Sequence, residues 1–519
     1  MANSRHAAQL QLVEVDELTP TSAGAVPDSS RPTTAGAPEP RPPADAPLDD
    51  APPESGVAAG EDGWDPDDEA APHGWPARRR RVLAWVAAIG AAVLVLAALA
   101  AWDDARRADA YERAVSVPGL LEPLDGPVHV TWRAAAASGE GSVVVADDTL
   151  VVVEQDSSGG SLVGHAAETG QHRWTTRVTG PPAATERAWL QCPSWRGARV
   201  SGLVLCTTDL AIPVYGDPAP GESVADGLEG LRVVAVDAAT GRSVGSWTEK
   251  GDVAGFGRVD DDIVVAVTDP DGRTLVQRRA GRTGDVVWSY RSLQQLSGTL
   301  AIERASMELT DRVAVVRGAE LVVLRLDDGE VVVAEARGQA VALVPFRDGF
   351  AAWTPARGGW MFDRDGEPVT ALPAVPSSLA IDDESAQEVA ILSTGVAVRG
   401  FEVATGNELW SLSTRATPQA VVDDTLLVAD DGRWAAYDAH TGASLWSHEL
   451  EAPAWPVLTD GSLVLTAVED GDRVTLLARG LRDGAQRWQV SVPPQVTRLS
   501  AIGGLLVGRT DEGVVVLAP

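Results

Sequence analysis

The sequence predicts an all-β chain that folds as a β-propeller of about eight four-stranded blades. Two observations favour this fold: a short phrase that ends in tryptophan recurs after residue 128, and β-branched runs bounded by acidic turns stand between its copies. A third observation argues against a helical solenoid, because no segment after residue 128 keeps a 3.6-residue apolar period. One preceding membrane helix and a disordered tail complete the expected architecture.

The first 77 residues predict a disordered cytoplasmic tail. They are rich in Pro, Ala and Ser and carry 15 acidic residues against 3 arginines, with no sustained apolar pattern. The whole chain has a formal net charge of -32, which repels phosphate backbones and argues against nucleic acid as a partner. Lys250 is the one lysine, a bias that suggests a high-GC bacterium such as an actinomycete.

Residues 78–102 predict an Arg cluster and a transmembrane helix. Four arginines, 78–81, precede the 21 uncharged residues 82–102, long enough to cross the roughly 30 Å hydrocarbon layer. Trp85 and Trp102 lie near its ends, and the arginines on the N-terminal side orient the tail to the cytoplasm and the rest outside. A cleaved signal peptide is the alternative, but 81 residues before the apolar run exceed a normal leader. Residues 103–127 then predict a short stalk.

The repeated phrase marks hairpins from residue 128 to residue 519. It is clearest in Phe401-Glu-Val-Ala-Thr-Gly-Asn-Glu-Leu-Trp410 and Tyr437-Asp-Ala-His-Thr-Gly-Ala-Ser-Leu-Trp446. A glycine with access to positive φ is what such a tight turn requires. The further copies are Thr169-Gly170 with Trp174, Thr240-Gly241 with Trp247, Thr283-Gly284 with Trp288, Asp483-Gly484 with Trp488, and the degenerate Asp328-Gly329 and Asp365-Gly366.

The spacing of these glycines predicts the blades. The first interval is 71 residues and the others are 36 to 45, as expected for four strands. The last strand, Val514 to Leu517, lacks a following tryptophan strand, and Val128 to Trp132 is such a strand without a blade, so pairing them would close the ring. Eight hairpins plus this closing blade make nine, which exceeds the usual range of propellers, and the two degenerate copies need not be independent, so we predict eight.

The long first interval predicts an insertion near residues 180–228. It contains Pro181-Pro182, the run Gly216-Asp217-Pro218-Ala219-Pro220-Gly221 and both cysteines of the chain, Cys192 and Cys206. Their spacing fits no zinc ribbon or Cys-x-x-Cys redox motif, so we expect a disulfide that staples the insertion outside the cytoplasm.

The phrase Asp-x-x-Thr-Gly-x-x-x-x-Trp, nearest here from Asp438 to Trp446, resembles the repeat of the pyrroloquinoline-quinone-like (PQQ-like, quinoprotein-type) β-propeller family. The resemblance covers roughly residues 128–519. It implies that each tryptophan docks on the glycine turn of a neighbouring blade, although Trp247 stands two residues later than the others. The implied structural residues are Trp132, Gly170, Trp174, Gly241, Trp247, Gly284, Trp288, Gly406, Trp410, Gly442, Trp446, Gly484 and Trp488.

The family includes quinone-dependent dehydrogenases and cofactor-free scaffolds, which a repeat cannot distinguish. The dehydrogenases resemble one another in adjacent cysteines on the quinone and a calcium held by Glu, Asn and Asp. Here no cysteines are adjacent, and Asn407 in a hairpin turn is the one asparagine after the membrane segment. The sequence therefore predicts no catalytic residue and no cofactor.

Other candidate chemistry also favours a structural interpretation. His165 and His172, like His440 and His448, flank a repeat turn and are interpreted as solvent-exposed decoration rather than metal ligands. The acidic runs 260–262 and 382–384 precede expected inner strands and are interpreted as solvated turns rather than calcium sites. No nucleophile elbow, P-loop or His-Glu-x-x-His motif is present.

We therefore expect a single-pass protein of the cell membrane whose extracytoplasmic propeller is a non-catalytic scaffold for an envelope protein, peptide or glycan. A PQQ-dependent dehydrogenase is one alternative, and an envelope sensor that signals through the acidic tail is another. No Gly-x-x-x-Gly dimerisation face supports the sensor.

Overall fold

The computed structural model describes residues 108–519, apart from 110, 138–140, 158, 181–189, 195–196, 210–229, 297–304, 311, 319, 337–341, 348, 355–357, 431, 450–456 and 471–472. The tail 1–77 and the membrane segment 82–102 lie outside the described residues. Within the described part of the chain, no helix is long and apolar enough to cross a membrane.

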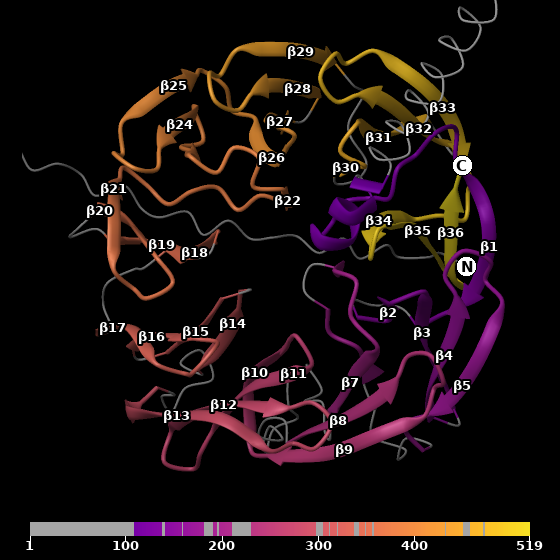
Figure 1. Ribbon diagram of the computed structural model, residues 1–519, viewed down its shortest axis with the longest axis vertical. Coiled ribbons are helices and arrows are strands. Elements are labelled where there is room, and N and C mark those ends of the chain that lie inside the picture. Colours follow the sequence, from indigo (N-terminus) through magenta and orange to yellow (C-terminus); the bar gives the residue numbers. More distant parts are fainter. Residues whose placement is uncertain are drawn as a thin grey trace, which may run out of the picture. The chain divides into compact units, whose positions relative to one another are not determined.

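In the described residues, nine sheets follow one another as the blades of a β-propeller, and their strand pairs are antiparallel except for one pair in blade 7 (Figure 1). We number the blades in chain order. Blade 1 contains β2 (Val143–Ala146), β3 (Thr149–Asp156), β4 (Gly159–Ala166) and β5 (His172–Arg177); blade 2 contains β6 (Leu190–Gln191), β7 (Leu203–Asp209), β8 (Gly230–Asp237) and β9 (Ser243–Lys250); blade 3 contains β10 (Asp252–Val259), β11 (Asp262–Thr268), β12 (Arg273–Ala280) and β13 (Val286–Gln295). Blade 4 contains β14 (Ser306–Leu309), β15 (Val313–Arg317), β16 (Glu320–Arg325) and β17 (Val331–Ala336); blade 5 contains β18 (Ala342–Phe346), β19 (Gly349–Thr354), β20 (Gly358–Phe362) and β21 (Pro368–Leu372).

Blades 6 and 7 share their strands unequally. Blade 6 has three strands, β23 (Val389–Ser393), β24 (Val398–Glu402) and β25 (Glu408–Leu412). Blade 7 has five, because β22 (Ile381–Asp382) pairs in parallel with β26 (Thr417–Val422), which is followed by β27 (Thr425–Asp430), β28 (Arg433–Asp438) and β29 (Ser444–Glu449). Blade 8 contains β30 (Leu458–Thr459), β31 (Leu463–Asp470), β32 (Arg473–Gly480) and β33 (Gln486–Val492).

Blade 9 closes the ring with both ends of the domain, which confirms the predicted closure. It joins β34 (Arg498–Ile502), β35 (Leu505–Thr510) and β36 (Gly513–Ala518) to β1 (His129–Ala135), with β1 antiparallel to β36. Trp132 lies opposite Val516 in this pair. The hydrogen-bonded closure removes two sheet edges that would otherwise lie open to another chain.

The predicted count of eight blades is corrected to about nine. Both degenerate copies of the repeat are true hairpins in sheets of their own: Gly329 lies between β16 and β17, and Gly366 lies between β20 and β21. Each glycine has positive φ, 74° and 80°, so the turn geometry survives although the threonine of the repeat is absent.

Burial explains why the middle strands are continuous apolar runs. Blades stack face to face, so a strand inside the stack is covered on both sides. In β11, Ile263, Val264, Val265 and Ala266 are all fully buried. The outer strands instead alternate, as in β5, where Trp174 is buried between exposed neighbours.

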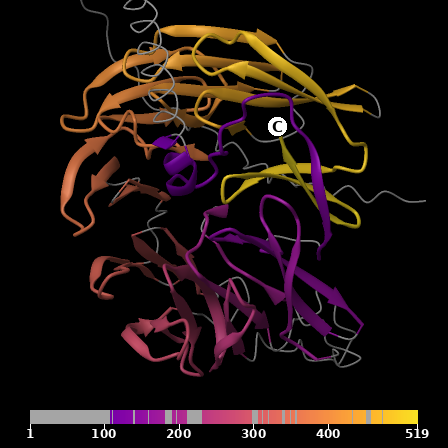
Figure 2. The same cartoon turned by 45° about the vertical axis from the view of Figure 1, so that its right-hand side comes forward.

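Residues 111–116 form a short helix that precedes β1, in the stretch assigned above to the stalk 103–127. From Ala114 onward this stretch packs against the propeller, with Ala114, Leu120, Leu121 and Leu124 buried. Figure 2 shows the helix among the strands of the ring rather than apart from them.

Candidate functional site

Six tryptophans of the repeat each join one blade to the next. Six indoles lie against the turn glycine of the following blade, where an added Cβ would come within 2.4 to 2.8 Å of ring atoms. Each indole Nε1 also donates to the carbonyl three residues before that glycine, at 2.7 to 3.1 Å. The pairs are Trp132 with Gly170, Trp174 with Gly241, Trp247 with Gly284, Trp288 with Gly329, Trp410 with Gly442 and Trp446 with Gly484.

Trp247 docks like the others despite its later position. A shift of two residues keeps a side chain on the same face of a strand. The position that tryptophan would normally fill is Gly245, where an added Cβ would lie 1.8 Å from the Arg282 carbonyl oxygen. The Trp247 indole therefore reaches Gly284 from a position two residues further along β9.

Trp488 is different because its docking turn does not exist. The next blade is blade 9, where the third strand β36 ends the chain and the outer strand β1 comes from the other end, so no hairpin joins them. The buried Trp488 Nε1 has no hydrogen-bond acceptor among the residues that the structure describes. Closure of the ring thus costs one of the repeated hydrogen bonds.

Two kinds of turn lie at the same end of each blade, which we call the turn face. Strands in a blade are antiparallel, so the turn from the inner to the second strand and the repeat turn from the third to the outer strand share one end of the sheet. In the repeat turns, Asp237 and Asp438 accept from the backbone N and Oγ1 of Thr240 and Thr441. The hydrogen bond from Thr240 lowers the pKa of Asp237.

The acidic turns are tied to arginines of outer parts of the blades. Asp148 in blade 1 accepts from Arg173 at 2.5 Å, and this hydrogen bond lowers the pKa of Asp148. Asp262 accepts from Arg278 at 2.7 Å in blade 3. These pairs fix the inner turns of blades 1 and 3 to their own blades.

The run 260–262 was predicted to be a solvated turn, and most of it is exposed. The side chains of Asp260 and Asp261 are 84% and 52% exposed. The Arg258 side chain, in contrast, is 5% exposed, donates to the Leu203 carbonyl and pairs with Asp261. Burial lowers the pKa of Arg258.

His440 belongs to a charged cluster that spans three blades. Its Nδ1 lies 2.5 Å from Glu388 Oε1 of blade 6, and its Nε2 lies 3.0 Å from Asp424 Oδ1 of its own blade. Arg482 of blade 8 pairs with Asp423 at 2.9 Å. The hydrogen bond to Asp424, and then the charge of Glu388, raise the pKa of His440. The interpretation of His440 as surface decoration is therefore replaced by a role in joining blades.

The other histidines also differ from exposed decoration, except for His172. His165 stacks on Trp132 with ring centroids 5.5 Å apart, and its Nδ1–H donates to the Gly170 carbonyl, so it covers the docked indole. His448 lies against Trp446 and reaches the Gly484 carbonyl in the same way. His172 is exposed and contacts Thr175. Among the described residues, no group of three or more His, Cys, Asp or Glu side chains could hold a metal ion.

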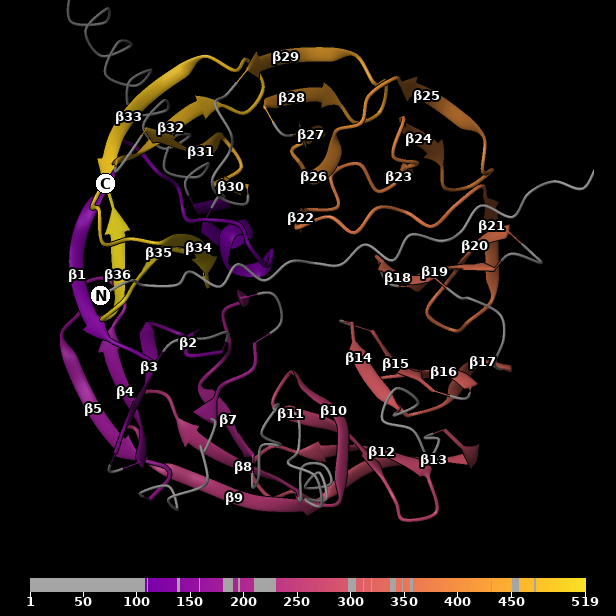
Figure 3. The same ribbon diagram turned by 180° about the vertical axis from the view of Figure 1, so that it is seen from behind.

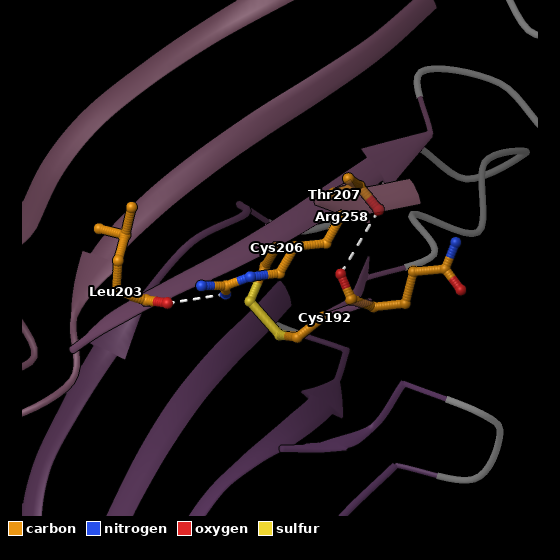
Figure 4. Close-up of a disulfide and its surroundings, with 6 residues drawn as sticks. Cys192, Leu203, Cys206, Thr207 and Arg258 are labelled. Carbon is orange, nitrogen blue, oxygen red and sulfur yellow. Dashed lines mark hydrogen bonds between the residues drawn. A yellow bond between two sulfur atoms is a disulfide. The ribbon is translucent and has the colours of Figure 1, made fainter. Parts of the chain in front are cut away.

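The disulfide between Cys192 and Cys206 is present, as predicted (Figure 4). Leu190 and Gln191 of β6 lie opposite Thr208 and Thr207 of β7, so the two cysteines continue this antiparallel register. Both are buried, and the bond fastens the two-residue inner strand β6 to blade 2. The predicted insertion 180–228 therefore contains two strands of a blade, and its remaining parts, 181–189 and 210–229, lie outside the described residues.

The segment 111–128, which we call the N-terminal segment, crosses the inner turns of the turn face. Leu121 N donates to Thr459 O at 2.8 Å, Leu124 N donates to Asp460 Oδ2 at 2.8 Å, and Glu122 N donates to Gly504 O at 2.7 Å. Thr459 is the last residue of β30, Asp460 lies in the turn between β30 and β31 of blade 8, and Gly504 lies between β34 and β35 of blade 9.

Arg199 fixes the same segment from blade 2. Its guanidinium donates to Glu122 Oε1 at 2.6 Å, to the Tyr111 hydroxyl at 2.9 Å and to the Gly503 carbonyl. The Arg199 side chain is 11% exposed. The segment is thus bound by blades from distant parts of the sequence.

Two cavities open beside these elements. The larger, of about 570 Å³, lies between blades 5, 6 and 7 and is bordered by residues 116–118 of the N-terminal segment. The smaller, of about 400 Å³, is lined by Arg199, Arg258 and Thr310. The larger cavity has the size of ordinary ligand pockets, roughly 300 to 1,000 Å³, and is the candidate site.

Sequence reasoning did not identify the residues of this cavity. Arg347, in the turn between β18 and β19, lies at its border with φ of 53° and donates to the carbonyls of Ala386 and Val389. Ser377 to Ala380 form another wall. The one available signal is Pro373 with Pro376, which interrupts the place where an inner strand is expected.

Comparison with known proteins supports the repeat family. The family model described as outer membrane protein assembly factor BamB matches residues 394–518, which span blades 6 to 9. None of the curated proteins matches the chain.

Many solved structures are similar to this chain at low identity. BamB from Moraxella catarrhalis is 15% identical over 75% of this chain and 99% of its own, with a TM-score of 0.38. A europium-containing methanol dehydrogenase is 13% identical over 75% of this chain and 85% of its own, with a TM-score of 0.36. Sqt1 from Saccharomyces cerevisiae is 8% identical over 75% of this chain and 99% of its own, with a TM-score of 0.37.

Proposed function

We propose that this chain, whose residues 394–518 match the BamB family of PQQ-like repeats, is a membrane-anchored extracytoplasmic propeller that acts as a non-catalytic binding scaffold. The observation that carries the proposal is the use of the turn face's charged side chains. Asp148, Asp262 and His440 pair with other side chains of the propeller, within or between blades. These charged groups stabilise the ring, whereas the 570 Å³ cavity combines apolar side chains such as Phe346, Val389 and Ile391 with polar ones.

The disulfide supports a position outside the cytoplasm. Disulfides persist in oxidising compartments and are rare in the bacterial cytosol. The Cys192–Cys206 bond lies within a blade and both cysteines are buried, so it belongs to the stable core of blade 2. The arginines before residues 82–102 place the N-terminus inside, which agrees with a propeller outside.

The anchor would hold the turn face near the membrane. Eight residues, 103–110, separate the proposed span from Tyr111, and a fully extended chain covers at most about 3.6 Å per residue. The N-terminal segment would then start within about 30 Å of the bilayer. A protein or peptide bound on the turn face would therefore be kept at the membrane surface.

Native mass spectrometry tests the scaffold against a dehydrogenase. We would incubate the full-length chain, purified in detergent, with calcium and pyrroloquinoline quinone and measure the intact mass. We expect no stoichiometric quinone adduct, since Cys192 and Cys206 are bonded across two strands and Asn407 lies exposed in a repeat turn. A one-to-one adduct with the quinone absorbance would overturn the scaffold.

The anchor is tested separately by alkaline phosphatase fusions in bacteria. A fusion after residue 519 is expected to be active, because the enzyme needs an oxidising compartment, and a fusion after residue 77 is expected to be inactive. The reverse pattern, or release of the propeller into the medium, would contradict the anchored topology.

A further inference from the structure

The interface between blades 5 and 6 is closed without a docked indole (Figure 3). Tryptophan stands four residues after the turn glycine in five copies of the repeat, but in blade 5 that position is Thr370. An added Cβ at Gly406, the turn glycine of blade 6, would lie 3.2 Å from Thr370 Oγ1 and 2.5 Å from the Ala371 carbonyl oxygen. In the residues described, this interface therefore has neither the apolar area of an indole nor its hydrogen bond to the next blade.

The interface between blades 6 and 7 is the natural comparison, because it has the docked indole. Trp410 belongs to its buried cluster, and the Trp410 Nε1 donates to the Ala439 carbonyl at 3.0 Å. Aromatic side chains bury a large apolar area each. The cluster between blades 5 and 6 instead joins Ala351, Met361 and Leu372 to Ala390, Leu392 and Phe401. We therefore expect blades 5 and 6 to separate more easily than blades 6 and 7.

An arginine bridges the interface that lacks the indole. Arg347 stands in the turn between β18 and β19 of blade 5, and its guanidinium donates to the carbonyls of Ala386 and Val389 at 3.0 and 2.9 Å. Val389 is the first residue of β23 in blade 6. The guanidinium also lies over the Phe346 ring, 4.5 Å from its centroid. The turn of blade 5 is thus joined to the start of blade 6 through one side chain.

The backbone of Arg347 adopts a conformation that is unusual for arginine. Its φ is 53°, in the left-handed region that residues other than glycine rarely adopt. The same turn position in blades 1, 3 and 7 is taken by Asp147, Asp260 and Asp423, and aspartate tolerates this region better. Such strained residues persist where the surrounding contacts hold them, and they gather at clamps and switches. The hydrogen bonds of Arg347 to blade 6 are contacts of this kind.

The opposite interface of blade 5 has a fastening of its own. It also lacks the indole, because the residue of blade 4 at the tryptophan position is Val333. Arg325 of blade 4, however, pairs with Asp365 in the repeat turn of blade 5. Phe350 of blade 5 is fully buried in the cluster that it forms with blade 4. We therefore expect blade 5 to stay with blade 4 when it separates from blade 6.

The candidate cavity lies at the interface of blades 5 and 6. Phe346 and Arg347 of blade 5 line it, and so do Ala386 and Val389 of blade 6. The groups that Arg347 joins are therefore walls of the cavity. Separation of the two blades at this point would widen the cavity on the side of blade 5.

We infer that blades 5 and 6 separate reversibly at this interface, and that Arg347 is the latch that restricts access to the 570 Å³ cavity. The open form is a minor state of the folded ring, because six docked indoles and the pair of β1 with β36 hold other blades together. A partner that fills the cavity would bind the open form and raise its population. The inference rests on the proposed scaffold function and names how its binding site is regulated.

Thiol labelling of introduced cysteines tests the opening. Cys192 and Cys206 are bonded to each other, so an added cysteine is the sole free thiol of the chain. Leu392→Cys reports on the interface of blades 5 and 6, and Val428→Cys is the matched control at the same strand position between blades 6 and 7. The two side chains are 0% and 1% exposed. The full-length chain in detergent is treated with a water-soluble maleimide, and the labelling rates are measured.

The two thiols are expected to differ in rate and in urea dependence. Leu392→Cys should react at least about tenfold faster than Val428→Cys without urea, because no indole hydrogen bond has to break when blades 5 and 6 separate. Its rate should change little at low urea, since a local opening exposes little surface. Equal rates for the two thiols, or an equally steep urea dependence, would overturn the inference.

Arg347→Gly tests the latch separately. Glycine adopts a φ of 53° without strain, so the turn is kept while both hydrogen bonds to blade 6 are lost. Labelling of Leu392→Cys should become at least about fivefold faster, as for the loss of two hydrogen bonds. Labelling of Val428→Cys should stay the same. An unchanged rate for Leu392→Cys would show that Arg347 is not the latch.

A second pair of cysteines covers the case in which Leu392→Cys does not fold. Ala390→Cys lies in the same buried cluster of blades 5 and 6, and Leu426→Cys is its control at the corresponding position of blade 7. The same difference in rate is expected, and its absence overturns the inference. Because labelling uses no quinone, failure here leaves the scaffold standing, and a quinone adduct would refute the scaffold whatever the labelling rates are.

Discussion

The hydrogen bond of a docked indole can be measured by comparing Trp446→Phe with Trp488→Phe. Both substitutions remove similar apolar area, but the Trp446 Nε1 donates to the Leu481 carbonyl at 2.7 Å, whereas the Trp488 Nε1 has no acceptor in the described part of the chain. Leu481 is 1% exposed, so phenylalanine at residue 446 leaves a buried carbonyl unpaired. An unpaired buried polar group costs about 1 to 3 kcal/mol.

We therefore expect Trp446→Phe to lower the free energy of unfolding by about 1 to 3 kcal/mol more than Trp488→Phe does. Urea unfolding of the full-length chain in detergent, followed by far-ultraviolet circular dichroism, measures this difference if the slopes agree. Trp410→Phe is a second test, because its Nε1 donates to the Ala439 carbonyl at 3.0 Å. Equal losses for all three variants would refute the account of ring closure given for Trp488.

Three further predictions concern the turns, the disulfide and pH. Gly442→Ala should lower the free energy of unfolding by more than the roughly 1 to 2 kcal/mol that a left-handed alanine costs, because its Cβ would lie 2.8 Å from an indole. Gly395 also has positive φ, but no atom lies within 4 Å of an added Cβ, so Gly395→Ala should cost only the amount for a left-handed alanine. Urea unfolding of the two variants measures the difference. Replacing Cys192 and Cys206 together by Ala should lower the free energy of unfolding by about 3 kcal/mol, since the bond closes a loop of 14 residues, and dithiothreitol should reproduce the loss. Because the pKa of His440 is raised in the folded protein, the ion pairs of His440 stabilise the fold fully below the ordinary histidine pKa, and this stabilisation is lost as pH rises through the raised pKa. The free energy of unfolding of the wild type should therefore exceed that of His440→Gln by more at about pH 5 than at about pH 9. An equal difference at both pH values would contradict the ion pairs.

The sequence was sufficient for features that depend on local pattern. The turn glycines and the tryptophans recur at fixed spacing, and the unpaired strands at the two ends of the domain predicted the closing pair of β1 with β36. The disulfide followed from two cysteines in one interval. The blade count was too low, because the aspartates that replace threonine at residues 328 and 365 weaken the phrase but not the turn, whose geometry depends on the glycine.

Features that depend on distant contacts could not be predicted in this way. Leu120, Leu121 and Leu124 stand in a proline-rich stretch without a helical or strand period, and their burial requires turns of blades 8 and 9 that lie more than 300 residues later. His440 looked variable within the repeat because one of its two partners, Glu388, comes from another blade. A pattern within one repeat carries no information about the neighbour against which it packs.

Blade 6 has no inner strand beside β23 among the described residues, which follows from the same competition between local and distant contacts. Pro373 and Pro376 prevent the incoming chain from forming a regular inner strand beside β23. The chain next pairs with a strand in blade 7, where Ile381 and Asp382 lie beside β26. Ile381 also contacts Gly119 of the N-terminal segment. Asp383 then accepts from the Asp423 backbone N at 2.9 Å, which fixes the shift to blade 7. Because these contacts hold β22 away from β23, Ser377 and Arg347 bind the carbonyls that β23 directs away from β24, and loop and side-chain contacts replace the missing inner strand.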